Sequence, residues 1–204
     1  MIWLRYWPII SVLIGMYVLE SGWAAILLYH AGILLGAWLK REQLRSLHWK
    51  SPPGLVIAML VSGLIAIPAV YFLTPLLTSP TIGTELSGQL DRLGLQGNSF
   101  FLFFAYFILL HPLIEETGWR GVLFTRKAGL HIHDVEFAAY HLVVLHWIMP
   151  GYWFLLVATF VTLTVSAWFW RQLRDRKGMA AVVAFHGAAD FGVLTAVAWL
   201  AGRF

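Results

Sequence analysis

The stretch SFFLFFAYFILLHPLIEETGWRGVLF, from Ser99 to Phe124, decides the fold expected for this chain. It begins with an unbroken apolar run and then places Glu115, Glu116 and Arg120 within the same hydrophobic stretch. A helix needs about 20 apolar residues to cross a hydrocarbon core about 30 Å thick, and this stretch is long enough. Because charge is costly inside a bilayer, these three charged residues require a structural or functional reason.

The rest of the chain has the composition of an integral membrane protein. Of its 204 residues, 60% are hydrophobic and only 12% are charged, and the apolar residues form long runs. We expect an all-α, polytopic transmembrane helical bundle with about seven spans (six to eight). No soluble linker interrupts the runs, which predicts a single domain over residues 1–204. The expected spans are roughly 2–19, 23–39, 54–77, 99–126, 135–149, 151–172 and 179–202.

The loops between the spans differ in charge. Residues 40–50 and 171–177 are rich in lysine and arginine, whereas residues 78–98 hold one arginine against two acids. The positive-inside rule places the basic loops and the N-terminus in the cytoplasm. These short basic clusters indicate membrane topology rather than nucleic acid binding, although the net charge is +4. Within the acidic loop, residues 86–95 are weakly amphipathic, and we expect either an interfacial segment or a plain surface loop.

Four charged residues lie well inside a span: Glu115, Glu116, Arg120 and Asp190. Glu116 and Arg120 are spaced i, i+4 with the acid first, the favoured order for a helical ion pair, which predicts a mainly structural role. Glu115 lies about 100° around the helix, on the face that it shares with His111 and Trp119. Glu115 is therefore the acid left without a structural explanation.

Two other expected spans carry matching polar groups. One contains FAAYH, Phe137 to His141, and the last contains FHGAAD, in which His186 and Asp190 are spaced i, i+4. With a rise of about 1.5 Å per residue, these groups reach the same band of the membrane as Glu115. We therefore expect catalytic residues on three of the C-terminal helices, within a core of about residues 99–202. The remaining intramembrane histidines, His30, His111 and His146, are expected to be interhelical hydrogen-bond partners.

The residue types indicate hydrolysis of a peptide bond in the bilayer or at its edge. A carboxylate beside a neutral imidazole can hold a water molecule and take its proton, so Glu115 and His141 form a natural water-activating pair. His186, oriented by Asp190, can stabilise a developing oxyanion. The chain has no cysteine, which excludes a thiolate metal site and a cysteine nucleophile.

The residues alone leave other mechanisms open. Glu115, His141 and His186 have the donor types of a hydrolytic zinc site, although HExxH is absent, so metal-free and metal-dependent hydrolysis both remain. A proton-coupled transporter also uses buried Glu, His and Asp, but the sequence has no repeated pair of broken helices.

Three motifs, taken together and in order, resemble those of a known family. EETGWR (115–120), FAAYH (137–141) and HGAAD (186–190) fit EExxxR, FxxxH and Hxxx(Asn/Asp). This set resembles the CAAX prenyl protease and bacteriocin-processing (CPBP, ABI) family of glutamate-type intramembrane endopeptidases. The resemblance covers about half the chain.

The resemblance implies an enzyme that needs neither metal nor cofactor. Glu115 and His141 would activate water, and His186 with Asp190 would form the oxyanion site. Glu116, Arg120 and Phe137 would support the catalytic helix. Asp190 departs from the asparagine of the prenyl protease branch, so we expect it to orient His186 or to be protonated.

The resemblance also implies a membrane-embedded or membrane-anchored protein or peptide substrate. A short, tryptophan-rich membrane protein is typical of a bacterial inner membrane, and bacteria generally lack prenylated CAAX proteins. The expected substrate is therefore a C-terminal sorting or anchor segment, or a bacteriocin-like peptide. One alternative is a non-catalytic immunity or membrane interaction protein of the same fold, and a second is a zinc-dependent intramembrane hydrolase.

Overall fold

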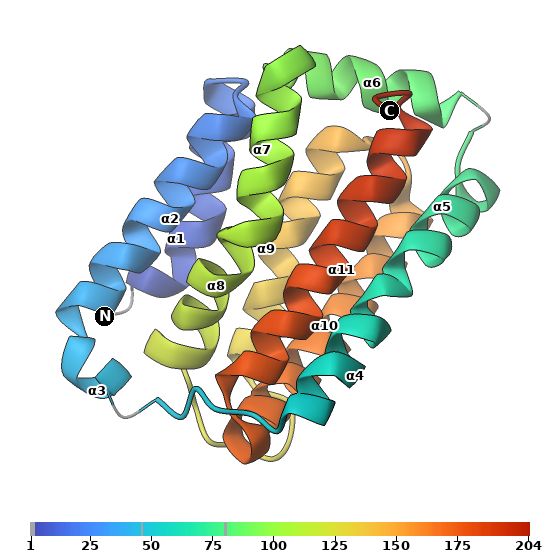
Figure 1. The fold of residues 1–204 in the computed structure, drawn as a ribbon. Coiled ribbons are helices and arrows are strands. Elements are labelled where there is room, and N and C mark those ends of the chain that lie inside the picture. Colours follow the sequence, from blue (N-terminus) through green and yellow to red (C-terminus); the bar gives the residue numbers. More distant parts are fainter. Residues whose placement is uncertain (1–2, 46, 80) are drawn as a thin grey trace.

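Most of the chain forms helices, because a backbone surrounded by lipid must satisfy its N–H and C=O groups within the same segment. The computed structural model describes residues 3–45, 47–79 and 81–204, and no β-strand occurs among them (Figure 1). The expected all-α bundle is confirmed. Its elements are α1 (Trp3–Val12), the π-helix η1 (Leu13–Val18), α2 (Gly22–Leu39), α3 (Arg41–Arg45), α4 (Pro53–Leu64), α5 (Ala66–Leu77), α6 (Ile82–Arg92), α7 (Gly97–Leu109), α8 (His111–Glu116), the π-helix η2 (Thr117–Val122), α9 (Ile132–Ile148), α10 (Trp153–Lys177) and α11 (Met179–Leu200).

Five helical segments are long and apolar enough to cross a membrane. They cover Gly22–Leu39, Pro53–Thr74, Gly97–Val122, Trp153–Lys177 and Met179–Leu200. The apolar segment Trp3–Val18 is shorter, and α9 has 17 residues. These seven segments follow the order of the seven expected spans, and the first and fifth are the short ones. The protein is a multi-pass integral membrane protein.

The segment Pro53–Thr74 bends in the middle, where α4 ends at Leu64 and α5 begins at Ala66. Pro68 cannot donate a hydrogen bond to the carbonyl of Leu64, and its ring crowds that carbonyl, so the helix changes direction one turn earlier. Both halves pack against α11, the helix that carries His186 and Asp190 (Figure 1). The bend therefore affects how α4 and α5 pack against α11.

The contact between α4 and α11 depends on Gly63. A Cβ added there would lie 2.6 Å from the Cβ of Ala188 and 2.6 Å from the carbonyl oxygen of Phe185. We expect Gly63→Ala to lower the free energy of unfolding by about 1 to 3 kcal/mol, because the two helices must separate. Gly54→Ala is the matched control, since a Cβ at Gly54 meets nothing within 4 Å. Equal stability of the two variants in detergent would contradict this close packing.

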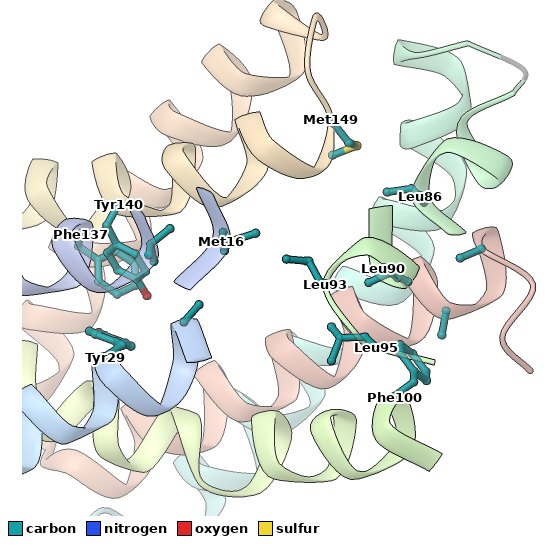
Figure 2. Close-up of a cluster of buried hydrophobic side chains, with 14 of the residues drawn as sticks. Met16, Tyr29, Leu86, Leu90, Leu93, Leu95, Phe100, Phe137, Tyr140 and Met149 are labelled. Atoms are coloured by element: carbon teal, nitrogen blue, oxygen red, sulfur yellow. The ribbon is translucent and has the colours of Figure 1, made fainter. Parts of the chain in front are cut away.

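The acidic loop contains a helix, α6, which lies across one end of the bundle (Figure 1). Its apolar residues Ile82, Leu86 and Leu90 are buried, and Leu93 and Leu95 belong to the same hydrophobic cluster (Figure 2). The apolar face of α6 therefore packs on protein. The segment forms an amphipathic helix and not a plain surface loop. Its apolar side chains, however, are buried in the bundle core and not in the membrane interface.

The motif EETGWR lies at the centre of the arrangement. α8 contacts α2, α7 and α11, while α9 packs against α10 and α1 (Figure 1). The helix that carries Glu115 is therefore flanked by the helix that carries His186 and by α2, to which the sequence motifs assign no role. This packing determines which side chains meet Glu115.

Candidate active site

The two adjacent glutamates lie at the point where the helical geometry changes. Glu115 and Glu116 are the last residues of α8, and the chain continues into the π-helix η2. π-Helical turns are rare and occur often at functional sites. Both glutamate side chains are fully buried, with 0% exposure. A buried carboxylate needs hydrogen-bond donors or opposite charges around it, and each glutamate has a different set.

Glu115 lies among two hydroxyl groups and two imidazoles. Its Oε1 accepts a hydrogen bond of 2.7 Å from the Tyr29 hydroxyl and another from the Tyr140 hydroxyl. Its Oε2 lies 3.1 Å from Nε2 of His111 and 3.3 Å from Nε2 of His186. Figure 2 shows Tyr29 and Tyr140 close together beside Phe137. The carboxylate is therefore held from four sides, by groups on α2, α8, α9 and α11.

Glu116 forms the expected ion pair with Arg120. The Nε atom of Arg120 lies 3.2 Å from Oε2 of Glu116, and both side chains are buried. The guanidinium carbon lies 4.4 Å from the centre of the Phe137 ring and 5.2 Å from that of Trp170. Aromatic faces attract a cation, so both rings stabilise the buried charge of Arg120. The spacing-based prediction of this pair is confirmed.

His186 connects the two glutamates. Its Nδ1 lies 2.7 Å from Oε1 of Glu116, its Nε2 is near Glu115, and Asp190 Oδ1 is 3.5 Å from the same Nε2. The ring stacks on Trp170 at a centroid distance of 4.8 Å. An imidazolium can donate from both nitrogens at once, which matches carboxyl groups on both sides. His186 thus contacts both glutamates in addition to the expected Asp190.

His141 reaches Glu115 through an intervening hydroxyl. Its Nδ1 lies 2.8 Å from the carbonyl oxygen of Phe137, and its Nε2 lies 3.1 Å from the Tyr140 hydroxyl. A carbonyl oxygen only accepts, so Nδ1 carries the proton and Nε2 of a neutral ring is free to accept. The Tyr140 hydroxyl therefore stands between the two groups that the sequence analysis paired directly.

Several polar residues of the site were not among the predicted catalytic groups. Tyr29 donates to Glu115 and accepts a 3.0 Å hydrogen bond from Trp119, while His30 and His111 bond to each other at 3.0 Å. Two sequence signals could have found them: His111 precedes Glu115 by one helical turn, and Tyr29 and His30 interrupt an apolar span. The prediction that His30 and His111 are interhelical hydrogen-bond partners was correct. It did not show that they bond to each other or that His111 lies beside Glu115.

Donor atoms suited to a metal ion also meet here. Among the described residues, His111, His186 and Asp190 have ligand atoms within 4.8 Å of one another. Two imidazoles and a carboxylate are a donor set that zinc accepts. This set differs from the predicted Glu115, His141 and His186, because the Nε2 of His141 faces the Tyr140 hydroxyl.

A polar cavity of about 370 Å³ opens beside the end of η2, lined in part by Arg5, Lys40 and His133. A much smaller apolar cavity shares Val122 and Leu123 with it and extends to Trp119. Trp119 donates to the hydroxyl of Tyr29, the partner of Glu115. The two cavities thus approach the cluster from the basic end of the bundle. Glu115 lines neither of these two cavities.

Fold and site together define a polytopic helical membrane protein with a buried carboxylate and imidazole cluster. Residues 97–192 match the family model described as type II CAAX prenyl endopeptidase Rce1-like. This match confirms the resemblance inferred from the three motifs. No curated protein and no solved structure matches the chain. A match to this family implies an intramembrane CAAX-type endopeptidase, a protease that acts on a membrane-associated substrate.

Proposed function

We propose that this protein is a metal-independent, glutamate-type endopeptidase that hydrolyses a peptide bond of a membrane-anchored substrate. The observation that carries the proposal is the buried Glu115 carboxylate, which lies 3.3 Å from His186 inside the segment that matches the family. A fully buried acid with polar groups on every side is costly to maintain for stability alone. Its arrangement fits a group that exchanges protons during catalysis.

Glu115 acts as the base in this proposal. A water molecule between Glu115 and His141 gives its proton to the Glu115 carboxylate, and its oxygen attacks the carbonyl carbon of the substrate. His141 helps to hold the water, because its Nε2 is a hydrogen-bond acceptor once the Tyr140 hydroxyl turns fully to Glu115. Tyr29 and Tyr140 orient the carboxylate through Oε1.

His186 and Asp190 stabilise the oxyanion that forms. Charged His186 keeps Nδ1–H on Glu116 and directs Nε2–H towards the carbonyl oxygen. Two ionised glutamates then balance charged Arg120 and His186, and a protonated Asp190 keeps the cluster neutral. A protonated Asp190 is also a donor, which explains how aspartate replaces the asparagine of the prenyl protease branch. When the C–N bond breaks, Glu115 returns its proton to the leaving nitrogen, which yields a free amine and a carboxylic acid.

The substrate and the topology complete the proposal. The basic loops and the N-terminus lie in the cytoplasm, and the protein belongs in a bacterial inner membrane. The substrate is a C-terminal sorting or anchor segment, or a bacteriocin-like peptide. A non-catalytic immunity or interaction protein remains the alternative, and it predicts that changes to Glu115 have no chemical consequence.

The test compares protein termini in bacterial membranes that contain the wild-type protein or Glu115→Gln. Mass spectrometry should detect new termini that depend on the wild type. Two internally quenched CAAX peptides, one farnesylated and one not, measure the same activity with purified protein in liposomes. Cleavage that depends on Glu115 in either assay supports the endopeptidase. Identical termini in both membranes, with neither peptide cleaved, would overturn it in favour of the non-catalytic protein.

Metal removal separates the proposal from a zinc-dependent hydrolase, which the grouping of His111, His186 and Asp190 favours as a second candidate. We expect EDTA and 1,10-phenanthroline to leave the cleavage rate unchanged, because Glu115 activates water without a Lewis acid. The metal content of the purified protein should be well below one ion per chain. Loss of activity with a chelator and recovery with zinc would establish the second candidate instead.

A further inference from the structure

Three buried or half-buried groups near Glu115 have no role in the proposed mechanism: Tyr106, His30 and His111. They come from α7, α2 and α8, so they meet only because these helices pack together. The side chains of His30 and His111 are buried inside apolar spans. Unpaired polar groups are costly in such surroundings, so each histidine must make specific hydrogen bonds.

The three groups form one continuous line of contacts to the catalytic carboxylate. The Tyr106 hydroxyl lies 2.7 Å from Nδ1 of His30. His30 Nε2 lies 3.0 Å from His111 Nδ1, and His111 Nε2 lies 3.1 Å from Glu115 Oε2. The two imidazole rings are stacked 5.2 Å apart, and Phe107 covers His111 at 4.2 Å. Each ring therefore uses both nitrogens and is held in place by neighbouring aromatic rings.

With Glu115 ionised and both imidazoles neutral, the position of every proton in this line follows. A carboxylate only accepts, so Nε2 of His111 must carry a proton, and Nδ1 of a neutral His111 must accept. His30 then donates from its own Nε2 and accepts at Nδ1 from the Tyr106 hydroxyl. In this arrangement all donors point towards Glu115, and each ring nitrogen of the two histidines has a polar atom within 3.1 Å. If Glu115 were protonated towards His111, all these hydrogen bonds would reverse.

We propose that Tyr106, His30 and His111 are positioning residues that hold Glu115 in its ionised form and orient Oε2. The inference rests on the proposed function, in which Glu115 must be a carboxylate before each turnover. His111 makes the contact, His30 selects the tautomer of His111, and Tyr106 selects the tautomer of His30. His30 does not need to contact the substrate or Glu115, so its effect on catalysis passes through the hydrogen bonds.

A comparison of three variants tests the line with the peptide that the wild type cleaves. His30→Leu removes the donor to His111, and we expect kcat to fall about 2- to 10-fold with little change in KM, as for one hydrogen bond between neutral groups. His30→Gln should restore most of kcat, because its amide can accept from Tyr106 and donate to His111. His146→Leu is the control, since His146 is exposed and stacks on Trp153; among the described residues it makes none of the interhelical hydrogen bonds expected of it.

The three variants distinguish positioning from simple packing. Equal losses in His30→Leu and His30→Gln would overturn the proposal, and so would a His30→Leu variant that behaves like His146→Leu. A wild-type protein without activity would count against the proposed function rather than against this line.

A second measurement needs no activity at all. Nitrogen-15 NMR of the histidine-labelled wild-type protein, with His30→Gln for assignment, reports where the imidazole protons are. We expect His30 and His111 to be neutral and protonated at Nε2. A charged ring, or a proton at Nδ1 of either residue, would overturn the proposal even if His30→Leu failed to fold.

Discussion

Glu115→Gln loses the activity and keeps the fold. We expect kcat to fall by about 10²- to 10⁴-fold, the usual contribution of a positioned general base, because an amide cannot take a proton from water. Glutamine has nearly the same shape as glutamate, so it can still accept from Tyr29 and Tyr140. The protein should stay folded but with a lower thermal midpoint in detergent, because charged His186 loses one of its two carboxylate neighbours.

Glu115→Asp tests the position of the base separately from its charge, because the side chain keeps its carboxylate but is one methylene group shorter. We expect its kcat to lie between those of the wild type and Glu115→Gln, and the termini released in membranes should follow the same order. Glu85→Gln, on the exposed end of α6, is the control and should leave kcat unchanged. If Glu115→Gln cleaved peptide as fast as the wild type, the base would have to be another residue.

Arg120→Leu has the largest expected effect on stability. It leaves the fully buried Glu116 without its ion-pair partner 3.2 Å away, and breaking a buried pair typically costs about 3 to 5 kcal/mol. Phe137 and Trp170 also lose the cation between their rings. We expect a loss of this size in the free energy of unfolding, measured by SDS titration in mixed micelles.

A double variant identifies the cause of the loss. Arg120→Leu with Glu116→Gln should be more stable than Arg120→Leu alone, because the uncompensated charge is gone and the glutamine can still accept from His186. Arg45→Leu is the control: this arginine is exposed, and its pair with Glu42 should contribute less than about 1 kcal/mol. A double variant less stable than Arg120→Leu would mean that packing of the arginine, rather than charge, supports the helix.

The sequence predicted those parts of the site that lie within one helix. Glu116 and Arg120 pair as their i, i+4 spacing indicated, and Glu115 shares a face with His111. His186 and Asp190 are likewise in contact along α11. These predictions were possible because helical geometry alone brings residues four apart to one side.

Contacts between helices were less accessible to prediction. The sequence placed His141 at the depth of Glu115 but could not show that Tyr140 lies between them. It also offered no reason to bring Tyr29 and His30 from α2 into the site. In a soluble helix, apolar periodicity marks the buried face, but in a membrane span both the lipid face and the protein face are apolar. The sequence therefore does not show which face of each helix points towards the protein interior.

By itself, the sequence determined the class of the protein, the order of its helices and the residues able to carry the chemistry. The length of an apolar run and the cost of an intramembrane charge are local properties, so they can be read from the chain. Only the tertiary structure decided which groups surround Glu115, because that depends on how α2, α9 and α11 are turned and how deeply they lie against α8. Tyr29, Tyr140 and His186 meet one carboxylate through packing between helices that no motif in the chain records.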